Sequence, residues 1–411
     1  ICMKNFKFIQ LFKAVRGGIY MAKTFKSGVT LLILTFFCST FIFGNSAILK
    51  NINAAAKINQ SSSSTQIASV KYKIKDGTIT IYGKGKMPNS MTFKKNRQIH
   101  TVIIRNGVTS VSKYAFYNCK NLKGIRLNDG LKTIESEAFN SSGLETIVIP
   151  ASVENVGTSA FYRCASLKTA MFEDDNSLKI IANFLFFECA QLENVVFGKN
   201  SKMDFIGNSS FDKCVSLKSI DIPEGVTVID YGAFEGCSGL QSVKFPSTLQ
   251  TLRSHSFYDC TSLTAVAIPA ATVSINHNSF TGCDALREIV VEAGNPTYHS
   301  DGNCIIETAA KKLAIGCSGS VLPQDDSVTE IGFIDPYGVF QGCTALERVR
   351  LSANLETVGR CAFEGCTALK EMALPDAVRW IHWEAFSGCT ALRRVSIPGT
   401  VVEIEPGAFD D

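Results

Sequence analysis

The sequence predicts a β-rich solenoid, a stack of about twelve coils, each roughly 23 residues long, with a parallel sheet and a preceding β-hairpin cap. Three observations predict this fold. Phenylalanine recurs at a nearly constant interval, each interval repeats the same apolar positions, and the second apolar pair of each interval is too short for a stable helix. One such coil cannot bury its own apolar face, so neighbouring coils are expected to stack.

Composition and charge limit the class of protein. The chain has 411 residues, of which 45% are hydrophobic and 19% are charged, so it is too apolar to be intrinsically disordered. Residues 1–98 carry 16 Lys and Arg residues and a single acid, Asp76, which leaves a net charge of −11 for the remainder. An acidic body argues against a nucleic-acid partner, since binding phosphates requires a basic surface.

The N-terminal residues have the pattern of an export signal. A short basic stretch at Met21–Lys26 precedes the uncharged apolar run Val29–Phe43, and small residues follow. A run of about fifteen residues suits a signal-peptide core better than a membrane span, which needs roughly 20 residues. We predict a signal peptide over 21–56 and no membrane span in the mature chain, with an N-terminal membrane anchor as the alternative. Residues 1–20 are interpreted as an upstream extension.

Two segments separate this signal from the repeats. Residues 57–70 contain four consecutive serines, which is typical of a flexible linker. Residues 72–82 alternate apolar and polar types around Asp76-Gly77, which is a strong hairpin signal. We expect residues 71–98 to form the N-terminal hairpin cap that a solenoid needs to shield its first core edge.

The repeats fill the region 99–411, which we assign to the solenoid. Twelve phenylalanines fall in one phase: Phe116, Phe139, Phe161, Phe186, Phe211, Phe234, Phe257, Phe280, Phe340, Phe363, Phe386 and Phe409. The differences between successive numbers are 23, 22, 25, 25, 23, 23, 23, 60, 23, 23 and 23. Agreement over twelve units excludes a chance pattern.

Each unit contains one strand and one further apolar pair. After Phe211, the segment Leu217–Ile222 has the alternation of a short strand, and Pro223 ends it because proline has no N–H to donate. The pair Val226 and Ile229 then follows. We expect a coil of short strand and turns whose Phe and Leu side chains point into a shared core.

The long interval from Phe280 to Phe340 departs from this pattern. It exceeds two ordinary units, and turn signals at Gly294–Pro296 and Asp301–Gly302 indicate where the surplus lies. We predict an elaborated repeat over 284–340, with a hairpin centred near residues 308–311 that rides on the solenoid without breaking it. The chain stops two residues after Phe409 without a visible C-terminal cap, so we expect a truncated chain.

The unit Ala-Phe-x-x-Cys-x-x-Leu-x-x-Val-x-Ile-Pro-x-x-Val-x-x-Ile resembles the BspA-type leucine-rich repeat of bacterial surface antigens. The resemblance covers roughly residues 99–411. Residues 294–323 also resemble an elaborated repeat of that family, and residues 76–87 resemble the hairpin that often precedes its repeats. The resemblance implies a leucine-rich-repeat-like solenoid in a secreted or surface-displayed binding protein. It identifies no ligand, because the repeat motif is a scaffold pattern without catalytic residues.

Ten cysteines share one position, three residues after the phenylalanine. They are Cys119, Cys164, Cys189, Cys214, Cys237, Cys260, Cys283, Cys343, Cys366 and Cys389. We interpret them as a structural column of small buried thiols. Close C-x-x-C pairs are absent from the sequence, so no metal site is expected. Cys304 and Cys317 flank the predicted hairpin, and both a disulfide and two free thiols remain open for them.

Catalytic chemistry is not indicated. The histidines fall at different phases of the repeat, at His100, His255, His277, His299 and His382, so they do not converge on one site. No nucleophile elbow, phosphate loop or dinucleotide fingerprint occurs in the sequence. We therefore expect a protein without catalytic residues, metal or cofactor.

Candidate ligand-binding residues gather in the last third of the chain. They are Arg348, Arg350, Glu371 and Arg394 at outward strand positions, and Tyr337, Trp380 and Trp383 near the turn before the phenylalanine. Tyr, Trp and Arg are enriched at binding hot spots. Two alternatives to ligand binding stay open. The charged residues could instead pair with one another along the sheet, and the aromatic residues could instead cover the outer edge of the solenoid.

Two functional hypotheses follow. The leading one is a secreted or cell-surface, adhesin-like and non-enzymatic protein that binds an extracellular protein or glycan of a host or neighbouring cell. The alternative is a structural repeat protein of the cell envelope, or a glycan-binding module.

Overall fold

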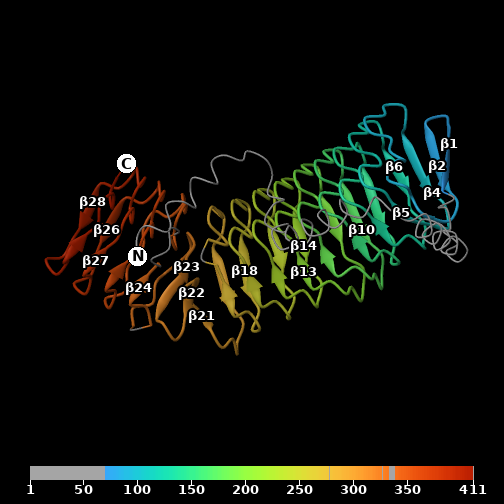
Figure 1. Cartoon of the computed structure of the whole chain (residues 1–411). Coiled ribbons are helices and arrows are strands. Elements are labelled where there is room, and N and C mark those ends of the chain that lie inside the picture. The colour runs from blue at the N-terminus through green and yellow to red at the C-terminus, as the bar shows by residue number, and fades with distance from the viewer. Residues whose placement is uncertain (1–69, 277, 326, 333–337, 411) are drawn as a thin grey trace, which may run out of the picture. The chain divides into compact units, whose positions relative to one another are not determined.

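The computed structural model of the chain describes residues 70–276, 278–325, 327–332 and 338–410. These residues form a solenoid of about 14 turns with parallel strands, and none of them lies in a helix. Figure 1 shows the coils stacked in sequence order, from blue to red. The predicted fold class is confirmed.

The predictions for the N-terminal segments lie outside the described residues. This applies to the upstream extension 1–20, the signal peptide 21–56 and nearly all of the linker 57–70. Within the part of the chain that the structure describes, no helix has the length and hydropathy needed to cross a membrane.

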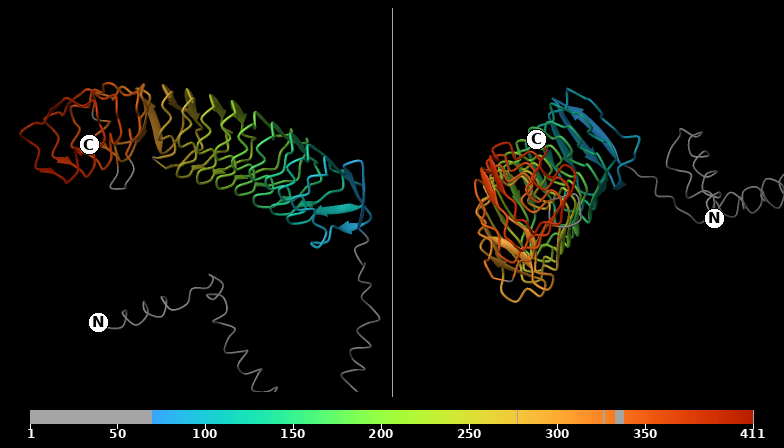
Figure 2. Two further views of the ribbon diagram at one scale, coloured as in Figure 1. Left: turned by 90° about the horizontal axis from the view of Figure 1, so that it is seen from above. Right: turned by 90° about the vertical axis from the view of Figure 1, so that its left-hand side faces the viewer.

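Most coils contribute one strand to each of two faces, and Figure 2 shows the stack from above and from one end. The first face holds β2 (Thr78–Tyr82), β4 (Thr101–Ile104), β6 (Gly124–Arg126), β8 (Thr146–Ile149), β10 (Thr169–Phe172), β12 (Asn194–Val196), β14 (Ser219–Asp221), β16 (Ser242–Lys244), β18 (Ala265–Ile268), β20 (Glu288–Val291), β26 (Glu371–Ala373) and β28 (Arg394–Ser396). All of them except β2, which belongs to the predicted hairpin, are strands that the Leu-x-x-Val-x-Ile pattern predicted. The strand that this pattern also predicted at Arg348 and Arg350 is not formed, so that prediction was wrong.

The second face was not predicted as a sheet. It holds β3 (Gly85–Lys86), β5 (Val108–Val111), β7 (Thr133–Ile134), β9 (Asn155–Val156), β11 (Ile180–Ile181), β13 (Phe205–Ile206), β15 (Val228–Ile229), β17 (Thr251–Leu252), β19 (Ser274–Ile275), β24 (Glu330–Ile331), β25 (Thr357–Val358), β27 (Trp380–Ile381) and β29 (Glu403–Ile404). The second apolar pair of each unit lies here. In one unit Val226 and Ile229 are fully buried, so two-residue strands suffice to close the core.

The hairpin cap is present, and it also supplies the first coil. β1 (Lys71–Lys75) pairs antiparallel with β2, and β2 pairs parallel with β4, with Thr78 opposite Thr101. The Phe93 ring stacks on Phe116 at 5.5 Å. The structure therefore begins the first coil inside the segment 71–98 that was assigned to the cap. This coil escaped notice because Thr92 and Asn96 replace the usual Ala and Cys.

A column of phenylalanine rings runs through the core. Neighbouring rings from Phe93 to Phe280 and from Phe340 to Phe409 lie 5.0–5.6 Å apart with interplanar angles of at most 24°. As expected, Phe234, Phe257 and Phe280 belong to one buried stack. Within each of these two runs, the stacked rings join each coil to the next.

A column of thiols lies beside the rings. Nine of the ten thiols, all except Cys343, donate a hydrogen bond to the carbonyl of the phenylalanine one coil earlier, as Cys237 Sγ does to Phe211 O at 3.1 Å. The same carbonyl also accepts the Cys214 N–H at 3.1 Å. Equivalent thiol bonds of 3.0–3.2 Å are made by Cys119, Cys164, Cys189, Cys214, Cys260, Cys283, Cys366 and Cys389. Cysteine thus fills both the space and the second acceptor site of the carbonyl.

Strand pairing between coils depends on coil length. β6 and β8 are unpaired where the phenylalanine interval changes from 23 to 22, and β12 and β14 are unpaired where it changes from 25 to 23. β9 and β11 are unpaired where it changes from 22 to 25. At each of these three steps the opposite face stays paired, through β7–β9, β8–β10 and β13–β15. A change in coil length between neighbouring coils therefore removes the strand pairing on one face and leaves the pairing on the other face intact.

The elaborated repeat contains the predicted hairpin. β22 (Cys304–Glu307) and β23 (Lys312–Ile315) pair antiparallel around the turn 308–311, and β21 (Tyr298–Asp301) adds a third strand. β23 then pairs parallel with β24. The coils remain stacked across this repeat, but the sheets on both faces are interrupted, contrary to the expectation of an unbroken solenoid. On the second face β19 and β21 lie in separate sheets, and on the first face β20 is the last strand of its sheet.

Stacking across this interruption relies on other contacts. The Tyr298 hydroxyl accepts the Ile275 N–H at 3.2 Å, and Asp284 Oδ1 accepts the Thr344 N–H at 3.3 Å. The Gly316 N–H donates to the Val339 carbonyl at 3.3 Å, in the place where a phenylalanine bonds in ordinary coils. A Cβ on Gly316 would clash with the Phe340 ring, so the missing side chain leaves room for that ring.

Cys304 and Cys317 are free thiols in this structure. Both lie near Ser320, whose hydroxyl is 3.7 Å from Cys317 Sγ. Burial raises the pKa of Cys304 to about 12, so its thiol stays protonated at neutral pH.

Phe257→Ala is expected to lower the free energy of unfolding by about 3–5 kcal/mol, because it removes a fully buried ring that touches two coils. Chemical denaturation followed by far-UV circular dichroism measures this loss. Val148→Ala, at a position 40% exposed, is the control and should change it by less than about 0.5 kcal/mol. Equal losses in the two variants would contradict the buried column.

The column thiols are expected to be unreactive in the folded chain. Burial raises the pKa of Cys164 to about 11, and only the thiolate attacks a disulfide reagent. Ellman's reagent at pH 8, with labelled positions mapped by mass spectrometry, should modify these cysteines only after denaturant is added. Rapid native labelling of Cys164 or Cys237 would show that the column is open.

Candidate binding surfaces

The predicted charged residues lie on the first face of the last coils. Glu371 on β26 is in register with Arg394 on β28, and Arg348 Nη2 lies 3.5 Å from Glu371 Oε1. Arg348 and Glu371 are 73% and 52% exposed, so this ion pair contributes little to stability. Arg350 is also exposed. The contact favours the ladder interpretation for Arg348, while Arg350 and Arg394 make no ion pair with another described residue.

The predicted tryptophans lie elsewhere. Trp380 is on β27 of the second face with 40% of its surface exposed, and Trp383, 36% exposed, follows in the next turn. The Arg360 guanidinium lies 4.9 Å from the centre of the Trp383 ring, a cation–π contact. Tyr337 lies outside the described residues. The candidate residues thus form two surfaces on different faces, as the sequence left open.

Glu405 bonds the turn that contains His382 and Trp383. Its Oε2 accepts the main-chain N–H of Trp383 at 2.7 Å, and its Oε1 lies 3.0 Å from His382 Nδ1. The hydrogen bond from His382, together with that from the Trp383 N–H, lowers the pKa of Glu405 below its ordinary value. Glu405 therefore holds the main chain of the turn that carries Trp383, and Arg360 contacts the indole itself.

One group in the described part of the chain has donor atoms close enough for a metal ion. Cys361 Sγ and carboxylate oxygens of Glu364 and Glu384 lie within 4.8 Å of one another. Burial, assisted by a hydrogen bond and charge repulsion from Glu364, raises the pKa of Cys361 to about 12. A metal ion would have to displace this proton before the sulfur could bind it.

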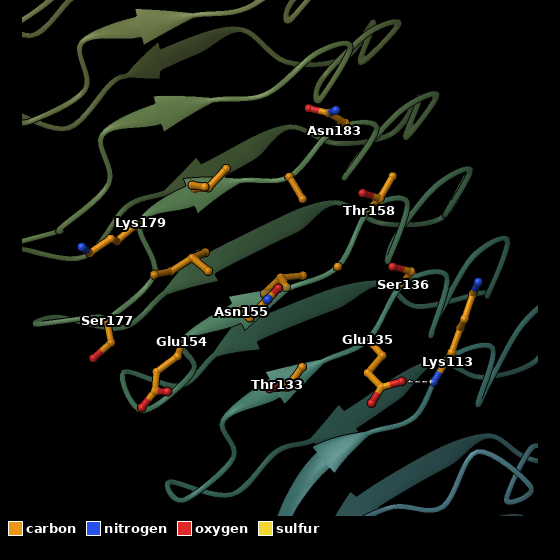
Figure 3. Close-up of a pocket in the computed structure, with 15 residues that line it drawn as sticks. Lys113, Thr133, Glu135, Ser136, Glu154, Asn155, Thr158, Ser177, Lys179 and Asn183 are labelled. Atoms are coloured by element: carbon orange, nitrogen blue, oxygen red, sulfur yellow. Dashed lines mark hydrogen bonds between the residues drawn. The ribbon is translucent and has the colours of Figure 1, made fainter. Parts of the chain in front are cut away.

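The structure also contains a groove that the sequence analysis missed. It has a volume of about 850 Å³ and lies between β9 and β11 on the second face. Figure 3 shows hydroxyl and amide side chains along it, with Lys179, Ser177 and Glu154 toward one end and Lys113, Glu135 and Ser136 toward the other. Its lining includes the half-exposed Ile180 and the buried Leu178 and Val156.

Two longer coils open this groove. The turn between the faces has two more residues in the coils after Phe161 and Phe186 than in the regular coils. These turns fit one another, since Asp174 Oδ1 accepts the Lys199 N–H at 2.8 Å. The shorter preceding coil has no matching residues, so β11 does not pair with β9. The lengthening of the phenylalanine interval from 22 to 25 was the signal in the sequence that locates this groove.

Protonation of Glu405 is expected to loosen the turn that carries Trp383. Because the folded pKa of Glu405 is lowered, its stabilising contribution is complete above the ordinary glutamate pKa and is lost as pH falls through the lowered value. In a Trp380→Phe background, the emission maximum of Trp383 should shift to longer wavelength in that acidic range. Adding Glu405→Gln should remove this transition, and an unchanged transition in that variant would contradict the assignment.

Comparison with known proteins was made by sequence and by structure. The family model for the BspA type leucine rich repeat region (6 copies) matches residues 88–204, 204–322 and 317–411. None of the curated protein sequences matches the chain significantly.

The solved structures similar to this chain include two proteins from bacteria. A leucine rich cell surface protein from Faecalibacterium prausnitzii is 24% identical, with 83% of this chain and 90% of that chain covered and a TM-score of 0.55. A leucine-rich repeat protein from Bacteroides ovatus is 20% identical over 83% of this chain and 90% of its own, with a TM-score of 0.47. At these identities the likeness concerns the fold alone. The family match spans most of the chain, so this protein belongs to the BspA-type leucine-rich repeat family.

Proposed function

We propose that this chain is a secreted or cell-surface binding protein that contacts macromolecules of a host or neighbouring cell and has no enzymatic activity. Its family membership supports this proposal, as does the description of the Faecalibacterium prausnitzii protein of the same fold as a cell surface protein. The acidic body of the chain argues against nucleic acid as the partner.

The observation that carries the proposal is the exposure of large anchors in the last coils. Trp380 and Trp383 are 40% and 36% exposed, and Glu405 accepts the main-chain N–H of the latter. Arg350 and Arg394 lie exposed on the first face. Because a solenoid face is long and shallow, affinity must come from a few aromatic and arginine anchors spread over a large area.

The side chains most suited to catalysis are engaged locally. His255 Nδ1 lies 2.8 Å from the Tyr231 hydroxyl, His299 Nδ1 lies 2.9 Å from Thr308 Oγ1, and His382 bonds Glu405. These pairs are on separate coils. The column thiols are protonated and donate to backbone carbonyls, which favours a structural role over nucleophilic catalysis.

Binding to immobilised extracellular-matrix and cell-surface proteins tests this function. We expect specific binding by the intact chain, reduced at least tenfold by Arg348→Glu with Arg350→Glu or by Trp380→Ala with Trp383→Ala. Lys218→Glu with Lys244→Glu is the matched charge control, because both lysines are exposed on earlier coils. Binding that survives both test variants would exclude the last coils, and no specific binding by the intact chain would favour a structural role in the cell envelope.

A further inference from the structure

The groove between β9 and β11 exposes backbone groups that are bonded elsewhere on this face. In other coils, the residue before the second-face strand and the residue after it each donate a main-chain N–H to a carbonyl of the preceding coil. Asp204 N–H donates to Lys179 O at 2.9 Å, and Gly207 N–H donates to Ile181 O at 2.9 Å. The corresponding donors one coil earlier are the N–H groups of Lys179 and Ala182, and no hydrogen bond among the described residues joins them to the coil of β9.

Matching acceptors line the opposite side of the groove. By the same register, the carbonyls of Glu154 and Val156 are the groups that the coil of β11 would bond if the sheet were continuous. Two N–H donors on the coil of β11 therefore lie on one side of the groove, and two carbonyl acceptors on the coil of β9 lie on the other. This arrangement is the one that an added β-strand satisfies, since an extended peptide offers alternating N–H and C=O groups.

The charges of the groove favour an acidic occupant. Glu154 already pairs with the Lys132 ammonium at 2.6 Å, and the Glu135 carboxylate accepts the main-chain N–H of Lys113 at 3.1 Å. The Lys179 ammonium has no carboxylate within ion-pair distance in the described part of the chain, and the Lys113 ammonium lies over the ring of Tyr114. The two lysines lie toward opposite ends of the groove (Figure 3). They are thus available to carboxylates of a bound chain.

We propose that this groove binds an extended acidic peptide segment. Its backbone pairs with the N–H groups of Lys179 and Ala182 and with the carbonyls of Glu154 and Val156. Its carboxylates contact Lys179 and Lys113, and Ile180 provides an apolar contact beside the strand. This site lies on different coils from the Arg and Trp surfaces, so it goes beyond the function proposed above.

Hydrogen exchange of the chain alone tests the open edge. The amides of Lys179 and Ala182 should exchange at least tenfold faster than those of Asp204 and Gly207, which occupy the same positions one coil later and are bonded. Exchange followed by mass spectrometry with fragmentation resolves these sites. Equal protection at the two pairs of positions would show that the edge is closed and would overturn the proposal.

Peptide selection tests the occupant. The probe is a phage-displayed library of random octapeptides with two fixed acidic positions, selected on the immobilised full chain. Selected peptides should lose at least tenfold in affinity for Lys179→Glu and for Asn155→Trp, which fills the groove. Lys168→Glu, an exposed lysine of the same coil outside the groove, is the matched control and should bind normally. Circular dichroism checks that each variant is folded.

Further measurements separate strand addition in this groove from binding at the Arg and Trp surfaces and from binding of an acidic glycan. Backbone N-methylation of a selected peptide should abolish binding, and the peptide should slow exchange at Lys179 and Ala182. The variants of Arg348, Arg350, Trp380 and Trp383 should leave peptide binding unchanged, so failure here is distinct from failure of the proposed function. Peptides that bind the groove variants normally, or groove binding by polygalacturonate but by no selected peptide, would overturn the proposal.

Discussion

Parallel pairing on both faces is kept only between neighbouring coils of equal length, and the architecture of this solenoid depends on that constraint. The two strands of a coil are joined by a turn, so extra residues in that turn shift one strand relative to the other. The coil can then match its neighbour on one face only. β9–β11 is lost while β8–β10 is kept, and two coils later β12–β14 is lost while β13–β15 is kept. Surface features of the chain thus arise where the repeat is imperfect.

The phenylalanine and thiol columns make such imperfections tolerable. Across the groove, the rings of Phe161 and Phe186 still lie 5.6 Å apart, and Cys189 Sγ still donates to Phe161 O at 3.2 Å. These contacts lie at the turn that leads from the second face back to the first, whereas the extra residues lie in the turn from the first face to the second. The contacts therefore do not depend on the length of that longer turn. A coil can therefore lose pairing on one face without leaving the stack. The same separation lets the hairpin of β22 and β23 interrupt both faces while Asp284 and Thr344 remain bonded.

The sequence was sufficient for features that repeat and insufficient for features that occur once. The period, the buried phenylalanines and the hairpin near 308–311 follow from patterns of residue type. The second sheet was missed because a pair such as Thr251–Leu252 is too short to show alternation, although its neighbours on both sides stabilise it. The thiol bonds were missed because spacing along the chain does not reveal that Cys237 reaches the coil of Phe211. The groove could be located only by comparing unequal phenylalanine intervals. Such a comparison shows between which coils the strand pairing is lost, but not on which of the two faces.

Free thiols and the proposed extracellular location are compatible in this fold. Oxidising compartments favour disulfides, yet the described part of the chain contains thirteen free cysteines. Two thiols form a disulfide only after one loses its proton, and burial raises the pKa of thiols such as Cys164 to about 11. Neighbouring column thiols such as Cys214 and Cys237 are also bonded to carbonyls, so forming a disulfide between them would break both bonds together. The column is therefore protected from oxidation by the same burial and hydrogen bonds that join the coils.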